Sequence, residues 1–414
     1  MSLSYRDDSM QNCVPDLEQP FPSEEYQARL SRIRERMAGE NIDLLFLTSP
    51  EAINYVSGYQ CEWYQAQSPK QWPATSGIAI HVDYDRFIHF DTEREQILAR
   101  YCSVAEDIRI FPPDSMRDGT AFIVEQLKAE GWLPATVGME LWSYRPNRVL
   151  SHRIEDRFSA AGAVVVDASH ILRELRWVKS AAEMECIVEA ARIADIGLGA
   201  AKAELRPGIT ELEVYGAMVH AMAAAGGENP GITQPVLSGA KSCAAHAMSS
   251  RRVMQAGEIV LVDCSGVFKR YHCNMARTFS LGEPAADVRE QADKAAGSMK
   301  LLGELIRPNL PVRDLYETMK AYYEEVGIWQ DRGFIGGYEM GIAFPPDWVG
   351  NFIYDVSADE NIDRVFEPGT VVNYENQFFL PRRTGLFFMI ETLAFFDDEA
   401  RLMSSVPYGL TVVE

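Results

Sequence analysis

The sequence lacks an excess of basic residues. It contains 39 lysines and arginines against 60 aspartates and glutamates, which gives a formal net charge of −21. A surface this acidic repels nucleic acid and anionic membranes, so we expect neither as a partner. We interpret the acidic charge as a solubilising surface.

The sequence also lacks segments that direct a chain to or across a membrane. Its first residues, MSLSYRDDSMQN, contain no basic region followed by an apolar run, so we expect no signal peptide. No stretch of about 18 apolar residues, the length that spans a membrane, is present. The seven cysteines are odd in number and form no CxxC pair. This pattern favours reduced thiols and a cytoplasmic location over disulfides or a zinc site.

Hydrophobic patterning predicts two domains. Helical spacing and short apolar runs alternate over residues 1–172, which is typical of a small α/β domain. The stretch 171–180 is charged and leads into a long helical pattern. Residues 173–414 then combine helical segments with long apolar runs that we interpret as antiparallel strands. The predicted fold class is therefore α+β, with the larger domain at the C-terminal end.

Four polar residues interrupt the predicted strands of the second domain: Asp263, Asn274, Glu375 and Glu391. Burying a carboxylate is costly unless it is paired or used. The alternative interpretation, that each side chain reaches the surface at a strand edge, explains one such residue better than four. The pattern therefore predicts one shared polar site.

A histidine precedes the first of these strands. His246 lies in SGAKSCAAHAMSS, a loop rich in small residues that a substrate could approach. A solitary loop histidine is usually an ordinary surface residue. Its place beside the carboxylate strands makes His246 our candidate general acid and base, because imidazole titrates near neutral pH.

Several stretches together resemble the creatinase/prolidase/methionine aminopeptidase family. IDLLFLTSPEAINYVSGY is similar to the N-terminal domain of creatinase and prolidase, so the resemblance covers nearly the whole chain. The other stretches that carry it are AHAMSSRRVMQAGEIV, VDCSG, YHCNMARTF, GYEMGIAFPPDW, FEPGTVVNYEN and MIETLAF.

This resemblance implies a pita-bread catalytic domain preceded by a smaller creatinase-like α/β domain. It also implies a homodimer in which the N-terminal domain of one subunit lies near the partner's active site. An aromatic segment occupies the corresponding place in this chain and could attract a cationic substrate or pack at the dimer interface. Its aromatic residues are Trp63, Tyr64 and Trp72.

The resemblance shows that some of the family's metal ligands are missing from this sequence. Metallopeptidases of this family hold two metal ions with two aspartates, one histidine and two glutamates. Two of these five positions are changed here, to a weak neutral ligand and to a phenol in place of an imidazole. We therefore expect no metal cofactor; if a metal is bound, Asp263, Glu375 and Glu391 would hold it. The five matching positions are Asp263, Asn274, Tyr338, Glu375 and Glu391.

Two branches of the family work without metal, and they suggest a function. Creatinase hydrolyses the guanidino group of creatine, and ectoine hydrolase opens a cyclic amidine. The tyrosine within GYEMGIAFPPDW is closer to the ectoine branch, while Ala276 stands where creatinase has a carboxylate. We therefore predict a hydrolase of a C–N bond in a small cyclic amidine or guanidino compound, with a role in compatible-solute catabolism.

Roles in this predicted reaction follow from the resemblance. Glu375 and Glu391, with Asp263, would bind the N–C–N group, and His246 would move the proton. Tyr338 and Asn274 would orient substrate or water. A substrate carboxylate would need a cation, for which Arg382, Arg383, Arg332 and Lys70 are candidates.

Three other functions stay open from the sequence. The chain could be a Xaa-Pro dipeptidase-like metallohydrolase, although two metal ligands are changed. It could be a lyase acting on a small onium osmolyte, which the aromatic segment would suit. It could also be a catalytically silent binding protein, although the retained histidine and carboxylates argue against this.

Overall fold

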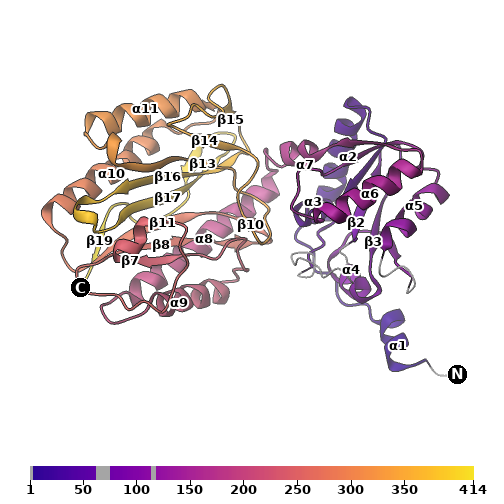
Figure 1. The fold of residues 1–414 in the computed structure, drawn as a ribbon, viewed down its shortest axis with the longest axis horizontal. Coiled ribbons are helices and arrows are strands. Elements are labelled where there is room, and N and C mark those ends of the chain that lie inside the picture. Colours follow the sequence, from indigo (N-terminus) through magenta and orange to yellow (C-terminus); the bar gives the residue numbers. More distant parts are fainter. Residues whose placement is uncertain (1–2, 62–74, 113–117) are drawn as a thin grey trace. The chain divides into compact units, whose positions relative to one another are not determined.

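The computed structural model describes residues 3–61, 75–112 and 118–414. The chain divides into two compact units, Met1–Leu175 and Arg176–Glu414 (Figure 1). Among the described residues, no helix has the length and apolar character needed to cross a membrane.

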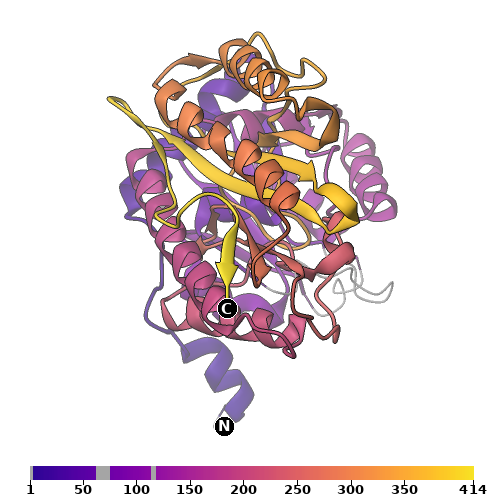
Figure 2. The ribbon, with the colours of Figure 1, turned by 90° about the vertical axis from the view of Figure 1, so that its left-hand side faces the viewer.

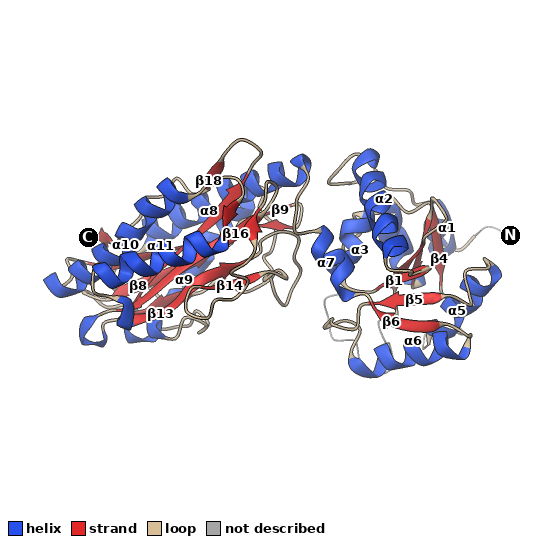
Figure 3. Cartoon of the chain, turned by 90° about the horizontal axis from the view of Figure 1, so that it is seen from above, coloured by secondary structure: helices blue, strands red, loops and turns tan. Residues whose placement is uncertain are grey.

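The N-terminal unit is built on a six-stranded mixed sheet of order β4-β3-β2-β1-β5-β6, with helices beside its strands (Figure 3). Apolar residues recur every three or four positions in its second helix and are buried, as expected for a helix packed on a sheet. Its elements are α1 (Tyr5–Asn12), α2 (Ser23–Gly39), β1 (Leu44–Leu47), α3 (Pro50–Ser57), β2 (Gly77–His81), β3 (Phe87–Asp91), η2 (Glu93–Glu95), α4 (Gln96–Cys102), β4 (Asp107–Ile110), α5 (Gly119–Ala129), β5 (Thr136–Met139), α6 (Arg148–Ala160), β6 (Val164–Asp167) and α7 (Ser169–Leu175).

The C-terminal unit is built on a larger sheet whose main path has the order β14-β13-β16-β17-β11-β8-β7. Strands β16 and β17 form a long antiparallel hairpin at its centre. The elements are α8 (Ala181–Glu204), α9 (Glu211–Ala224), β7 (Val236–Ser238), η4 (Gly239–Cys243), β8 (Ile259–Cys264), β9 (Val267–Phe268), β10 (Tyr271–His272), β11 (Met275–Leu281), α10 (Ala286–Leu305), β12 (Leu310–Pro311), α11 (Val312–Glu325), η5 (Trp329–Asp331), β13 (Arg332–Tyr338), β14 (Ile353–Asp355), β15 (Val365–Phe366), β16 (Val371–Phe379), η6 (Pro381–Arg383), β17 (Leu386–Phe395), β18 (Ala400–Leu402) and β19 (Thr411–Val413).

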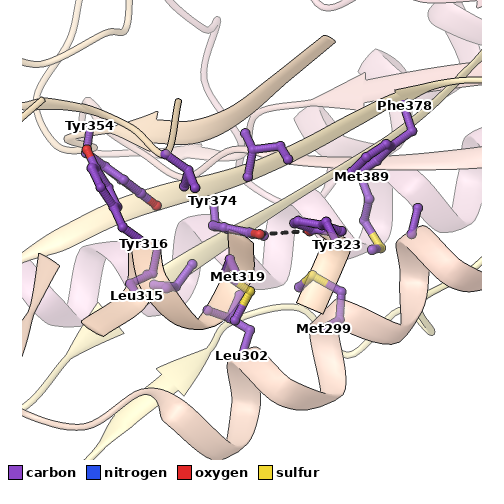
Figure 4. Close-up of a cluster of buried hydrophobic side chains, with 14 of the residues drawn as sticks. Met299, Leu302, Leu315, Tyr316, Met319, Tyr323, Tyr354, Tyr374, Phe378 and Met389 are labelled. Carbon is purple, nitrogen blue, oxygen red and sulfur yellow. Dashed lines mark hydrogen bonds between the residues drawn. The ribbon is translucent and has the colours of Figure 1, made fainter. Parts of the chain in front are cut away.

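Four long helices cover one face of this sheet. Two of them, α10 and α11, pack on β13, β16 and β17, as Figures 1 and 2 show. Figure 4 shows this core, where the hydroxyls of Tyr374 and Tyr323 lie 2.8 Å apart. The other two, α8 and α9, pack on β8 and β11. Capping boxes begin both α8, at Ser180, and α9, at Thr210.

A smaller apolar cluster lies on the opposite face. Side chains alternate between the two faces of a strand, so the neighbours of helix-facing residues point away from the helices. In β17, Met389 packs against the helices while Ile390 joins this smaller group. We call it the inner cluster; its residues are Leu237, Leu261, Ala276, Leu386, Phe388 and Ile390. The inner cluster marks the face on which the candidate site lies.

Candidate active site

Strand register places two carboxylates at the ends of one row across the inner face. Asp263 lies opposite Ala276, which lies opposite Ile390 on the next strand. Glu375 lies on the other side of Ile390. Residues paired across antiparallel strands point to the same side of the sheet. Both carboxylates are largely buried but retain some exposure, 8% for Asp263 and 6% for Glu375.

Two asparagine side chains connect these carboxylates. Asn274 donates from Nδ2 to Asp263 Oδ1 at 2.7 Å. Its Oδ1 accepts from Nδ2 of Asn373 at 3.0 Å. Nδ2 of Asn373 also donates to Glu375 Oε1, at 3.0 Å. Sequence reasoning missed Asn373, although its position two residues before Glu375 in one strand already placed both side chains on the same face.

Tyr338 ends β13 beside this hydrogen-bonded chain. Its backbone N–H donates to Asn373 Oδ1 at 2.7 Å. Its hydroxyl accepts from Nε1 of Trp348 at 3.0 Å and donates to Asn274 Oδ1 at 3.3 Å. Gly337 permits this approach, because a Cβ there would lie 1.9 Å from the backbone oxygen of Asn373. Burial, with the two nearby carboxylates, raises the pKa of Tyr338 well above its ordinary value, so the phenol stays a neutral donor.

The two carboxylates hold protons unusually tightly. Burial, reinforced by the negative charge of Glu375, raises the pKa of Asp263 to about 7. Burial likewise raises the pKa of Glu375 to about 7, against the opposing effect of hydrogen bonds from its polar neighbours. Removing a carboxylate from water disfavours its charged form. A cation bound at this row would displace the protons, because it favours both ionised carboxylates.

Glu391 does not join this row. It lies opposite Tyr374, whose side chain points into the helix-covered core, whereas Glu375 and Ile390 point to the inner face. Glu391 is fully buried and forms an ion pair with Arg277 at 2.9 Å. Its other oxygen accepts from the backbone N–H of Ser404 at 2.9 Å. This carboxylate ties strands together on the helix side and does not share a site with Asp263.

His246 is exposed, in the loop between η4 and β8. Its neighbours Ala245 and Ala247 pack against the inner cluster. That cluster includes Ala276 and Ile390, the two residues that separate the carboxylates. The structure therefore places the His246 loop on the inner face, the same face that carries the Asp263–Glu375 row.

Arg382 does not come together with this group. Arg382 lies in η6, in the connection between β16 and β17, and pairs with Asp287 at 2.8 Å. Its side chain is 62% exposed. The candidate substrate-binding aromatics of the N-terminal unit, Trp63, Tyr64 and Trp72, fall outside the described residues, as does Lys70.

The residues in the five metal-ligand positions do not fit a two-metal centre. Asn274 directs an N–H, not an oxygen, at Asp263, and Tyr338 is engaged through its hydroxyl. Glu391 is neutralised by Arg277 on the other face. Within the part of the chain that the structure describes, no three His, Cys, Asp or Glu side chains cluster as a metal site. These five residues therefore do not form a complete set of ligands for two metal ions.

Comparison with known proteins identifies two domain families. Residues 185–394 match metallopeptidase family M24, and residues 29–178 match the creatinase/prolidase N-terminal domain. A crystal structure of an X-Pro aminopeptidase from Thermotoga maritima superposes with a TM-score of 0.78, covering 93% of this chain and 99% of that one at 18% identity. These matches confirm the predicted pita-bread domain preceded by a creatinase-like domain.

Two characterised relatives are similar to the chain along most of its length. Ectoine hydrolase from Halomonas elongata is 26% identical over 388 residues, covering 86% of this chain and 89% of the relative. Xaa-Pro dipeptidase from Pyrococcus furiosus is 23% identical over 358 residues, covering 86% of this chain and 92% of the relative. Overall similarity therefore does not separate the two activities.

Proposed function

This chain belongs to metallopeptidase family M24, and on that premise we propose that it hydrolyses a C–N bond in a small cationic amidine or guanidino compound. A cyclic amidine of the kind opened by ectoine hydrolase is the favoured substrate. One observation carries the proposal: the inner face holds two buried carboxylates joined by two asparagine amides. The same positions do not form a two-metal ligand set.

The carboxylates bind the substrate in this proposal. An amidinium group is a planar cation with N–H donors on both nitrogens, which suits two carboxylates held apart on one face. Asp263 and Glu375 give up their protons when the cation enters, since a positive charge favours their ionised forms. Glu391, paired with Arg277, takes no part in binding.

His246 moves the proton in this reaction. Water adds to the carbon of the N–C–N group, and His246 accepts a proton from that water as the new C–O bond forms. His246 then donates the proton to the departing nitrogen as the C–N bond breaks. The remaining proton of the new hydroxyl passes to the amine as the carbonyl forms. The products are a protonated amine and an amide, or a urea if the substrate was a guanidino compound, and they are joined in one molecule if the substrate was cyclic. The carboxylates stabilise the positive charge of the bound substrate and the positive charge that forms again when the departing nitrogen is protonated.

The neutral side chains around the row orient the reacting groups. The phenol of Tyr338 receives a hydrogen bond from Trp348, which directs its own O–H toward Asn274 and the row. Asn274 and Asn373 keep the carboxylates at a fixed separation. A homodimer with the partner's N-terminal domain near this site stays a prediction.

A substrate panel tests the proposal. Purified protein should hydrolyse ectoine, should act more weakly or not at all on creatine, and should leave Xaa-Pro dipeptides intact. His246→Ala should abolish the ectoine reaction while the protein keeps its thermal unfolding temperature. Cleavage of Xaa-Pro dipeptides without amidine hydrolysis would instead favour the dipeptidase-like alternative. Retained turnover by His246→Ala would remove the role assigned to His246.

A further inference from the structure

One buried carboxylate holds both ends of the loop that carries His246. Glu211 begins α9 and is 0% exposed. Its Oε1 accepts hydrogen bonds from the backbone N–H and the hydroxyl of Ser238, each at 2.9 Å. Its Oε2 accepts from the backbone N–H and the hydroxyl of Ser250, again at 2.9 Å each. A single side chain thus joins the two ends of segment 238–250, and His246 lies between them.

Lys241 extends this anchor into the segment. Its Nζ lies 2.5 Å from Glu211 Oε2 and donates to the backbone carbonyl of Met248 at 2.6 Å. The same Nζ donates to the hydroxyl of Ser250 at 2.9 Å. The chain on both sides of His246 is therefore linked to Glu211. Ser238 and Ser250 bind Glu211 directly, and Met248 is linked to it through Lys241.

The site of Glu211 is built for a charged carboxylate. Burial raises the pKa of Glu211, but hydrogen bonds from Lys241, Ser238 and Ser250 outweigh burial, and the pKa is lowered. A buried charge is tolerated only where such bonds replace water. All of these bonds go to the His246 segment, so the charge serves to order that segment.

We propose that Glu211 is a positioning residue that holds His246 at the proton-transfer position beside the Asp263–Glu375 row. This inference rests on the proposed function, in which His246 moves the proton. Glu211 acts through the loop and does not touch the substrate. Substrate affinity depends on the carboxylates, whereas proton transfer depends on the placement of His246. Loss of the Glu211 anchor should therefore lower kcat and leave KM unchanged.

Glu211→Gln tests the anchor, because it keeps the size of the side chain and removes its charge. We expect faster amide hydrogen exchange over residues 241–249 and little change in the strands of the sheet. We also expect an approximately 10- to 100-fold lower kcat for the hydrolysed substrate with KM preserved. Glu213→Gln is the matched control. It removes a charge from the same turn of α9, where glutamine can still form the capping box, and it removes none of the loop contacts.

The two readouts separate this inference from the proposed function. Unchanged exchange over 241–249 in Glu211→Gln overturns the anchoring role, whatever the substrate. Faster exchange in a protein that hydrolyses none of the panel substrates supports the anchor and contradicts the proposed function. If Glu211→Gln lowers kcat and substrate affinity by equal factors, Glu211 does not act by positioning His246. If Glu211→Gln does not fold, Ser250→Ala removes one hydroxyl donor and repeats the comparison.

Discussion

At the scale of single residues, the main feature of the site is the pair of asparagine amides that hydrogen-bond to its two carboxylates. Asn274 and Asn373 supply hydrogen bonds to Asp263 and Glu375 without supplying a charge. The carboxylates are therefore not neutralised by a fixed cation of the protein in this chain of contacts. Burial raises the pKa values of both carboxylates against the opposing effect of these hydrogen bonds, and a substrate cation would supply the missing positive charge.

This arrangement predicts that substrate binding weakens in acid. Asp263 and Glu375 have pKa values of about 7, so they gain protons as the pH falls below 7. A cationic substrate must displace those protons. KM should therefore rise by about tenfold per pH unit for each displaced proton below pH 7 and level off above it. Steady-state kinetics between pH 5.5 and 8.5 would measure this dependence.

Two variants make the pH experiment specific. Glu375→Gln should raise KM at every pH and make the pH dependence shallower, because one of the titrating groups is gone. Gln377→Ala removes a neighbour that donates to Glu375 at 2.9 Å but carries no charge, so its KM should keep a dependence on pH. A KM that stays flat over this range in the wild type would argue against direct cation binding by the carboxylates.

At the scale of elements, the β16–β17 hairpin separates two carboxylates that look equivalent in the sequence. Glu375 faces the site, and Glu391 faces the helices and pairs with Arg277 of β11. Removing one partner of a buried ion pair leaves the other charge without compensation. We therefore expect the Glu391–Arg277 pair to stabilise the sheet and to take no part in the reaction.

Glu391→Gln should therefore destabilise the protein and spare substrate binding. We expect a loss of about 3–5 kcal/mol in the free energy of unfolding, because Arg277 stays buried without its counter-charge. In a unit of this size that corresponds to a fall of roughly 10 °C in unfolding temperature. Calorimetry would measure the fall, and kinetics well below that temperature should give an unchanged KM.

A surface ion pair provides the comparison. Glu399 pairs with Arg401 near the end of the same hairpin, and both side chains are about half exposed, 52% and 51%. Exposed pairs contribute little, so Glu399→Gln should leave the unfolding temperature unchanged. A rise in KM for Glu391→Gln as large as that for Glu375→Gln would instead show that Glu391 contributes to substrate binding.

The contrast between these two glutamates shows how far the sequence alone leads. Apolar runs interrupted by single acids were enough to predict the strands and to select Asp263 and Glu375. The pairing register between β16 and β17 could not be derived from the sequence. A shift of one residue in that register moves every side chain of a strand to the other face of the sheet. Asn373 could have been selected from the sequence, because it precedes Glu375 by two residues in one strand and therefore lies on the same face.

At the scale of the whole molecule, the chain keeps the architecture of a metallopeptidase family while its ligand positions have changed. The match to family M24 covers residues 185–394, so the fold could be predicted from motifs alone. The substrate could not, because hydrolases of different bonds share this architecture and similar identity. We propose that the distinction lies in the few side chains on the inner face.

We propose that Asp263 and Glu375 bind the substrate cation directly, without a metal between them. The most direct test of this proposal is ectoine hydrolysis by the purified chain before and after exhaustive treatment with a chelator, with metal content measured in parallel. We expect a metal-free protein whose activity is unchanged by the chelator. Stoichiometric metal, with activity lost to the chelator and restored by a divalent cation, would contradict it.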